Sequence, residues 1–193
     1  MLAKERVYSF LLKKNITIIF ITIIFIGYSG SLKAIEKISI INNFNSSETL
    51  KFDFIQKSFN KNEKGVCFLK RPYFLRCQYK DENQKELIIN NRVLVIYHRR
   101  YNKIYRYPVS QSFFTDILNK QKFSELISSG ENLPNKNFIE IKYFNKNKGE
   151  ITLFFNKKNY NLNGWRLVDI NNNITLLKIE NLIKNSDIKK NFF

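Results

Sequence analysis

The sequence predicts a mainly β, antiparallel protein with a few helices. Ala, the strongest helix former, occurs only at Ala3 and Ala34, whereas Phe and Tyr, which favour strands, total 28 of 193 residues. Strand-like segments recur about every 10–12 residues with short turns between them, which is the spacing of an antiparallel meander. The aromatic and β-branched content also argues against global disorder, and the length suffices for one domain with a sizeable core.

The N-terminal segment has the pattern of an export signal. Four basic residues and one acidic residue lie within residues 1–15, and residues 16–26 form the uncharged run ITIIFITIIFI. Residues 16–28 as a helix would span roughly 20 Å, short of the roughly 30 Å hydrocarbon core of a bilayer. We therefore expect a signal peptide over residues 1–34, cleaved after Ala34 or, as a second choice, after Ser31. The alternative is an uncleaved membrane anchor.

The charge of the chain is strongly positive but spread along its length. Lys and Arg total 33 against 16 Asp and Glu, a formal net charge of +17. Nucleic-acid binders gather basic residues with aromatic stacking platforms on one face, whereas Lys here is scattered and usually stands beside Asn. We therefore expect no nucleic-acid partner. The charge indicates a solvated surface or a weak attraction for anionic membranes.

The only two cysteines flank Pro72 symmetrically. Cys67 and Cys77 lie in the segments VCFLKR and FLRCQY, so a hairpin centred on Pro72 would place their side chains opposite each other. An exported protein can form a disulfide there, and cross-strand neighbours satisfy its geometry. Two buried thiols are the alternative. The chain has no CxxC motif, which argues against a zinc ribbon or thioredoxin-like chemistry.

Each element of the first half follows from its hydrophobic pattern. Residues 35–46 carry Ile at helical spacing and predict an N-terminal helix. Residues 50–55 alternate apolar and polar side chains, which is typical of a strand with one solvated face. Further strands are predicted over residues 65–71, 74–80, 86–90, 92–98 and 103–107, with Asn90-Asn91 as a tight turn.

Helices interrupt the strands in the middle of the chain. Ser110 to Ser112 precede a predicted helix over residues 113–118, and a further short helix is predicted over residues 123–127. Strands then resume over residues 138–144, 150–155, 165–170 and 174–179, with turns at Lys148-Gly149 and at residues 171–173. One domain over residues 35–185 is expected to contain these elements. The tail over residues 186–193 is predicted to be frayed.

Motifs of catalysis and metal binding are missing from the sequence. The single histidine, His98, has no second His nearby, and there is no GxSxG, no HExxH and no Gly-rich phosphate loop. We therefore expect neither an enzyme nor a metal site nor a cofactor.

Four segments in order resemble the LolA family of periplasmic lipoprotein carriers. They are FDFIQKSF (52–59), GVCFLKRPYFLRCQY (65–79), VLVIYHRRYNKIYRYPVSQSFFTDIL (93–118) and GEITLFFNKKNYNLNGWRLVDINNNITLLKIENL (149–182). Each motif is loose by itself, but all four occur in the family's order and cover most of the chain after the predicted signal.

The resemblance implies an unclosed antiparallel β half-barrel whose concave side is covered by a helical lid. Alternation along the strands of such a half-barrel would place one set of apolar side chains inside, where they would line a cavity for acyl chains. These are Phe52, Phe54, Leu69, Leu75 and Tyr97. The lid helix would contribute Phe113, Phe114, Ile117 and Leu118. An ordinary packed core is the alternative interpretation of these side chains.

The resemblance also implies a function and partners. A carrier of this family takes acylated lipoproteins from an inner-membrane lipoprotein-releasing ABC transporter to an outer-membrane lipoprotein receptor, so we expect a monomer in the periplasm. Arg71 is implied as a latch that binds the lid backbone at the cavity mouth, with a surface arginine as the alternative, and Trp165 is interpreted as structural. The rival functions are a lipidated receptor of the same shape and an exported domain that senses lipids or peptides.

Overall fold

The computed structural model describes residues 33–59 and 61–193. The chain separates into two compact units, residues 1–38 and residues 39–193. Residues 33–45 are helical, close to the predicted helix over residues 35–46. Apart from residues 33 and 34, the predicted signal segment lies outside the described residues.

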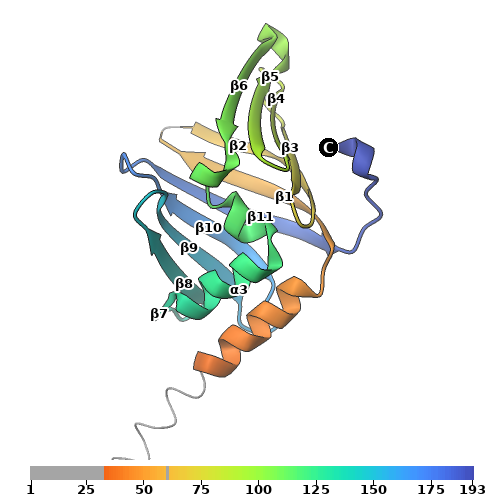
Figure 1. Cartoon of the computed structure of the whole chain (residues 1–193). Helices are drawn as coiled ribbons and strands as arrows, with labels where there is room; N and C mark the ends of the chain where they lie inside the picture. The colour runs from red at the N-terminus through yellow and green to blue at the C-terminus, as the bar shows by residue number, and fades with distance from the viewer. Residues whose placement is uncertain (1–32, 60) are drawn as a thin grey trace, which may run out of the picture. The chain divides into compact units, whose positions relative to one another are not determined.

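Eleven strands form a single antiparallel sheet in the second unit (Figure 1). They are β1 (Thr49–Ser58), β2 (Lys61–Lys70), β3 (Phe74–Tyr79), β4 (Lys85–Asn90), β5 (Val93–His98), β6 (Lys103–Pro108), β7 (Glu131–Leu133), β8 (Phe138–Asn145), β9 (Gly149–Asn156), β10 (Leu162–Val168) and β11 (Ile174–Lys184).

The sheet is open. Its strand order is β6-β5-β4-β3-β2-β1-β11-β10-β9-β8-β7, so β6 and β7 are its two edges and β1 pairs with β11 in the middle. Every other pair consists of consecutive strands joined by a hairpin or a short connection. The helical segment between β6 and β7 connects the two edge strands, which do not pair with each other. The predicted mainly β fold with an unclosed antiparallel sheet is confirmed.

Helices cover one face of this sheet, which we call the concave face (Figure 1). They are α2 (Phe114–Leu118), α3 (Lys120–Ser129) and the helical residues 39–45. Phe123 of α3 lies with its ring centroid 4.1 Å from that of Phe44 and 6.4 Å from that of Phe155 in β9. The Asn119 side chain accepts a hydrogen bond from the Lys122 backbone amide and begins α3, which is longer than the predicted 123–127.

Four strands differ from their predicted bounds by three residues or more. β1 and β2 are longer than the predicted 50–55 and 65–71, and β10 and β11 differ for local reasons. β10 begins at Leu162, before the predicted residue 165, and its pairing with β9 shifts in register between Leu162 and Gly164. Gly164 has a φ of 150°, and a Cβ there would lie 2.1 Å from the carbonyl oxygen of Leu177, so only glycine fits. β11 continues to Lys184, beyond the predicted residue 179. Its pairing with β1 shifts in register next to Asn181, which has a positive φ of 51°, and then resumes. β7 was not predicted, since three residues are too few to show alternation.

The prediction that Tyr97 lines the cavity is wrong. Tyr97 pairs with Glu86, whereas its neighbour Ile96 pairs with Leu87 on the concave face. Successive side chains of a strand point to opposite faces, so Tyr97 lies on the convex face, where its hydroxyl contacts Asn102. The run VLVIY is apolar on both faces and carries no alternation from which the inward face could be predicted.

The C-terminal tail also differs from the prediction. Residues 186–193 pack on the convex side of β2 and β3 instead of fraying, and the short helix η3 (Lys190–Phe192) lies there. The Phe192 carbonyl accepts a hydrogen bond from Arg76 at 2.8 Å, and its ring centroid lies 4.8 Å from that of Phe68. Ile188 is 8% exposed.

Cys67 and Cys77 are direct cross-strand partners in the β2–β3 pair and are joined by a disulfide with an S–S distance of 2.02 Å. Both are buried and lie on the concave face. The bridge therefore ties together two strands that form the wall of the candidate site.

We predict that the purified protein contains no reactive thiol under denaturing, non-reducing conditions. Replacing both residues, Cys67→Ala and Cys77→Ala, should lower the free energy of unfolding by about 2–3 kcal/mol, because the bridge closes a short loop in the unfolded chain. Thiol labelling with mass spectrometry and urea unfolding measure the two quantities. Two labelled thiols in the wild-type protein would contradict the prediction.

Candidate functional site

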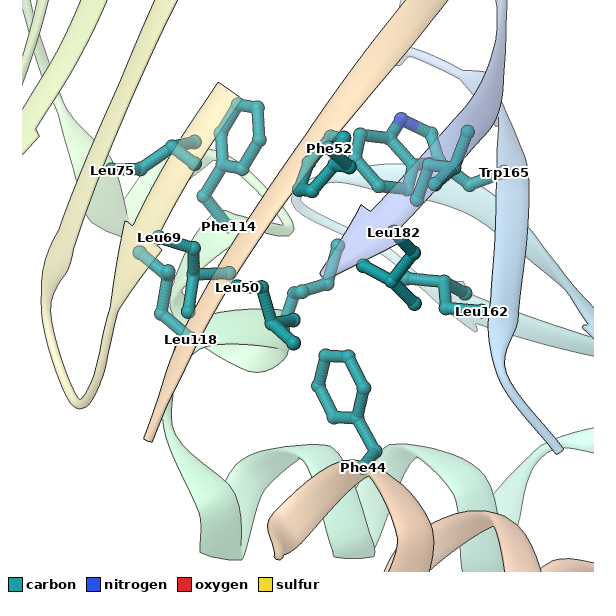
Figure 2. Close-up of a pocket in the computed structure, with 12 residues that line it drawn as sticks. Phe44, Leu50, Phe52, Leu69, Leu75, Phe114, Leu118, Leu162, Trp165 and Leu182 are labelled. Carbon is teal, nitrogen blue, oxygen red and sulfur yellow. The ribbon is translucent and has the colours of Figure 1, made fainter. Parts of the chain in front are cut away.

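The space between α2 and the concave face contains three adjacent cavities. The first, which we call the inner cavity, has a volume of about 10 Å³, near the space of a single water molecule. Figure 2 shows its apolar lining, to which β1, β2, β3, β10, β11, α2 and the helical residues 39–45 all contribute. The lining consists of Phe44, Leu50, Phe52, Leu69, Leu75, Phe114, Ile117, Leu118, Leu162, Trp165, Ile179 and Leu182. The inner cavity is almost filled by the protein's own side chains.

The second cavity, the rim cavity, has a volume of about 250 Å³. Most of its lining is apolar, but one end is polar. It is lined by Phe52, Gln56, Cys67, Leu75, Cys77, Tyr79, Lys85, Leu87, Ile96, Phe114, Trp165, Leu167, Thr175 and Leu177. The third, the side cavity, has a volume of about 170 Å³ between α2 and β10, and Phe113, Ile117 and Leu167 are among its lining residues.

Phe114 and Trp165 border all three cavities. Their rings meet edge to face with centroids 6.5 Å apart. Phe114 projects from α2, and Trp165 projects from β10. A displacement of α2 would therefore remove the partition between the cavities and join them into one apolar space.

Hydrogen bonds and an ion pair close the polar end of the rim cavity. The Tyr79 hydroxyl donates to Gln56 at 3.0 Å, Gln56 donates to Glu63 at 3.2 Å, and Lys85 forms an ion pair with Glu63. Burial and the nearby carboxylates raise the pKa of Tyr79, so its hydroxyl stays neutral and remains a donor. The cavity thus combines an apolar body with a polar end that can hydrogen-bond.

Arg71 joins the helices that cover the sheet. It follows the last residue of β2 and is 6% exposed. Its guanidinium donates to the carbonyl of Leu118, the last residue of α2, at 3.3 Å and to the carbonyl of Phe44 at 3.4 Å. Both carbonyls belong to the C-terminal ends of helices, where carbonyl groups lack helical partners and favour a cation. Arg71 also lies over the Phe44 ring, 4.2 Å from its centroid.

The environment of Arg71 is only partly favourable. Burial lowers the pKa of its guanidinium to about 10, although the Glu48 carboxylate opposes this effect, so Arg71 remains charged at neutral pH. Its Nε atom is buried without a hydrogen-bond partner among the described residues. Its two hydrogen bonds are long, so the contact between Arg71 and the helices is a weak one.

α2 has a second polar attachment to the sheet. Lys148, in the turn between β8 and β9, forms an ion pair with Asp116 and donates to the Thr115 hydroxyl at 3.1 Å. Lys148 and Asp116 are both mostly buried. This short helix is therefore attached by side chains at its middle and by Arg71 at its end.

The structure brings most of the sequence-predicted site residues together. Phe52, Leu69 and Leu75 line the inner cavity, whereas Phe54 is buried beneath Tyr79, with ring centroids 4.9 Å apart, outside the lining of these three cavities. All four predicted lid residues face the cavities: Phe113, Phe114, Ile117 and Leu118. The three residues before the predicted helix do not cap α2: the Ser112 hydroxyl donates to the Val109 carbonyl, and no side chain caps the helix.

Several lining residues were not predicted. Phe44 was assigned only to an amphipathic helix, and Trp165 was interpreted as structural, yet both line the inner cavity. Leu87 and Ile96 of the rim cavity lie in runs with apolar residues on both faces. The alternation of Trp165 with Leu167 in β10 was the one signal that could have found an inward-facing pair.

Neither a metal-binding cluster nor a membrane-crossing helix is found in residues 33–59 and 61–193. That part of the chain has no group of three or more His, Cys, Asp and Glu placed to hold a metal ion. It also has no helix with the length and apolar character needed to cross a bilayer.

The fold and the site define a class: an open antiparallel half-barrel whose apolar concave face is covered by helices. Residues 45–193 match the family described as Outer membrane lipoprotein carrier protein LolA. The chain belongs to this family. A comparison with curated protein sequences finds no match.

Solved structures are similar at low sequence identity. A LolA superfamily protein from Nitrosomonas europaea is 10% identical, with a TM-score of 0.42, over 80% of this chain and 96% of that chain. The lipoprotein LppX from Mycobacterium tuberculosis is 8% identical, with a TM-score of 0.44, over 83% of this chain and 99% of that one. The MucA/MucB complex from Pseudomonas aeruginosa includes a chain that is 8% identical, with a TM-score of 0.49, over 83% and 59% respectively.

We predict that Phe114→Ala joins the three cavities and increases the binding of an apolar fluorescent dye such as 1-anilinonaphthalene-8-sulfonate. The lost packing should also lower the free energy of unfolding by about 2–3 kcal/mol. The control is Phe144→Ala, because Phe144 is 67% exposed and lies outside the three cavities. Equal dye binding by the wild type and Phe114→Ala would show that Phe114 does not partition the space.

Proposed function

We propose that this protein is an exported carrier that holds the acyl chains of lipoproteins in the space beneath α2. It would receive them from an inner-membrane lipoprotein-releasing ABC transporter and deliver them across the periplasm to an outer-membrane receptor. The observation that carries the proposal is the row of three adjacent, mostly apolar cavities that Phe114 of α2 borders. Membership of the LolA family supports it.

The volumes support a closed, empty state. The rim cavity, at about 250 Å³, is smaller than the roughly 300–1,000 Å³ of typical small-molecule sites. An acyl chain therefore needs the space that α2 fills. Loading requires α2 to move away from Trp165.

The energies of loading and closing are comparable. An acyl chain of about 16 carbons gains about 12 kcal/mol on leaving water, at about 0.8 kcal/mol per CH₂. Exposing the four apolar side chains of the lid would cost about 6–12 kcal/mol, at about 1.5–3 kcal/mol for each. The net affinity is then a small difference between two burial terms, which lets a carrier bind and still release its cargo.

Arg71 adjusts this difference. Its hydrogen bonds to the Leu118 and Phe44 carbonyls exist in the closed state. An open lid would return the guanidinium and both carbonyls to water. The closed, empty state therefore gains from Arg71, and the loaded state does not. A carrier needs such a bias toward closure to unload.

We predict that an acyl chain enters beside Trp165, the only tryptophan of the chain. A lipopeptide with brominated acyl chains should quench the Trp165 emission in a saturable manner, because bromine quenches only at short range. The same peptide without acyl chains is the control and should have no effect. Absence of quenching under conditions where the lipopeptide is bound would place the cargo elsewhere and refute this site.

We predict that Arg71→Leu binds cargo more tightly, by up to roughly tenfold. The closed state loses two long charge-assisted hydrogen bonds, together worth about 1.5 kcal/mol at most, and leaves two carbonyls without their charged donor. Transfer from the purified loaded complex to acceptor membranes should slow accordingly. Arg71→Lys, which keeps the charge but not the fork, should be intermediate. If Arg71→Leu unloads as fast as the wild type, Arg71 is no latch.

A further inference from the structure

The hairpin formed by β5 and β6 differs in composition from the rest of the chain. Residues 92–108 contain four of the eight arginines and four of the ten tyrosines, but only one of the 25 lysines. Lys is the common basic residue everywhere else, so general enrichment in Lys does not account for this segment. Arg binds phosphate through two parallel hydrogen bonds, and Tyr prefers the interface between water and lipid.

The same segment carries an unbalanced positive charge. It holds five basic residues, and no Asp or Glu occurs anywhere over residues 87–115. Two carboxylates lie near the hairpin. Glu86 is bound by both Arg76 and Arg99, and the exposed Glu82 lies 3.8 Å from Arg100. Arg92, Lys103 and Arg106 are exposed and add three further charges.

The tip and the edge strand of the hairpin are exposed. Residues 99–108 are ten consecutive exposed residues, including η1 (Arg99–Tyr101) at the tip and all six residues of the edge strand β6. In Figure 1 the tip extends beyond the neighbouring ends of β1–β3. Among its apolar side chains, Tyr101 is 56% exposed, Tyr107 47% and Ile104 45%.

Cationic and aromatic groups lie on both faces of the hairpin. Tyr105 pairs with Ile96 and shares its concave face, whereas Ile104 pairs with Tyr97 and Arg106 with Val95 on the convex face. A binding groove of a protein contacts one face of such a hairpin, but a layer of lipid headgroups surrounds an inserted tip on all sides. The distribution therefore favours a membrane over a protein surface.

We infer that the β5–β6 hairpin docks on anionic phospholipid membranes. Arg92, Arg100, Lys103 and Arg106 bind the headgroup phosphates, and the tyrosines of the tip lie at the headgroup level. β4 and β5 also contribute Leu87 and Ile96 to the rim cavity, so docking brings that cavity toward the membrane. The relation to cargo rests on the proposed function, but the membrane contact itself does not.

The test is co-sedimentation of the protein with lipid vesicles. The protein is purified in the form that accumulates in cells. Binding to vesicles of phosphatidylglycerol and phosphatidylcholine in a 30:70 ratio is compared with binding to vesicles of pure phosphatidylcholine. The hairpin variant carries Arg92→Gln, Arg100→Gln, Lys103→Gln and Arg106→Gln, and it keeps Arg99 because Glu86 depends on it. The control variant removes the same charge at exposed sites elsewhere: Lys122→Gln, Lys136→Gln, Lys146→Gln and Lys158→Gln.

Each cation near an anionic surface contributes about fivefold in affinity, so the hairpin variant should bind anionic vesicles at least tenfold more weakly than the wild type. The control should stay within about twofold, and wild-type binding should fall with added salt. Equal losses in both variants would mean that only net charge matters and would overturn the inference. No binding by the wild type would overturn it as well, and a protein would then be the better occupant.

A second experiment tests, independently of affinity, whether the tip of the hairpin lies at the membrane. Tyr101→Trp places a second fluorophore at the tip, and vesicles with brominated lipid should quench it. Phe144→Trp, at an exposed site on β8, is the matched control and should not be quenched. Equal quenching at both sites would refute docking through the hairpin. These measurements use no cargo, so failure of the carrier proposal leaves their outcome unaffected.

Discussion

The concave face of the sheet must be covered, and the rest of the structure follows from this constraint. An open sheet leaves one apolar face without a partner sheet, and exposing that face to water would cost far more than a protein's net stability. α2, α3 and the helical residues 39–45 cover it, and the inner cavity is nearly filled as a result. A site that must close on itself when empty can admit a ligand only by exchanging one buried apolar surface for another.

The cover is not uniform in strength. α3 packs through Phe123, which is fully buried against Phe44 and Phe155. By contrast, α2 is a helix of five residues whose Phe114 is only partly buried and borders all three cavities. Side chains attach α2 to its surroundings: Arg71 through one long hydrogen bond to Leu118, and Lys148 through an ion pair. Short helices are marginal without tertiary contacts, so α2 is the part of the cover that can move at the lowest cost.

Much of this architecture follows from alternation and spacing in the sequence. Most strands are predictable because one of their faces is polar, and the opposition of the two cysteines is predictable because Pro72 lies midway between them. The lid role of the helix over residues 113–118 was implied by the resemblance to the LolA family. Tyr97 was misassigned because its strand is apolar on both faces, so only the pairing with β4 defines which face is inward. The packing of the tail on Phe68 and Arg76 could not be predicted, because a few distant contacts hold it and no periodic pattern encodes them.

The central claim is that α2 must leave Trp165 before an acyl chain can enter, and locking α2 to the sheet tests it most directly. Asp116 and Lys148 meet as an ion pair, so Asp116→Cys with Lys148→Cys allows a short thiol cross-linker to fix the lid while Cys67 and Cys77 remain in their disulfide. The locked protein should not take up an acylated peptide that the same variant binds before cross-linking. Undiminished uptake by the locked protein would contradict the account.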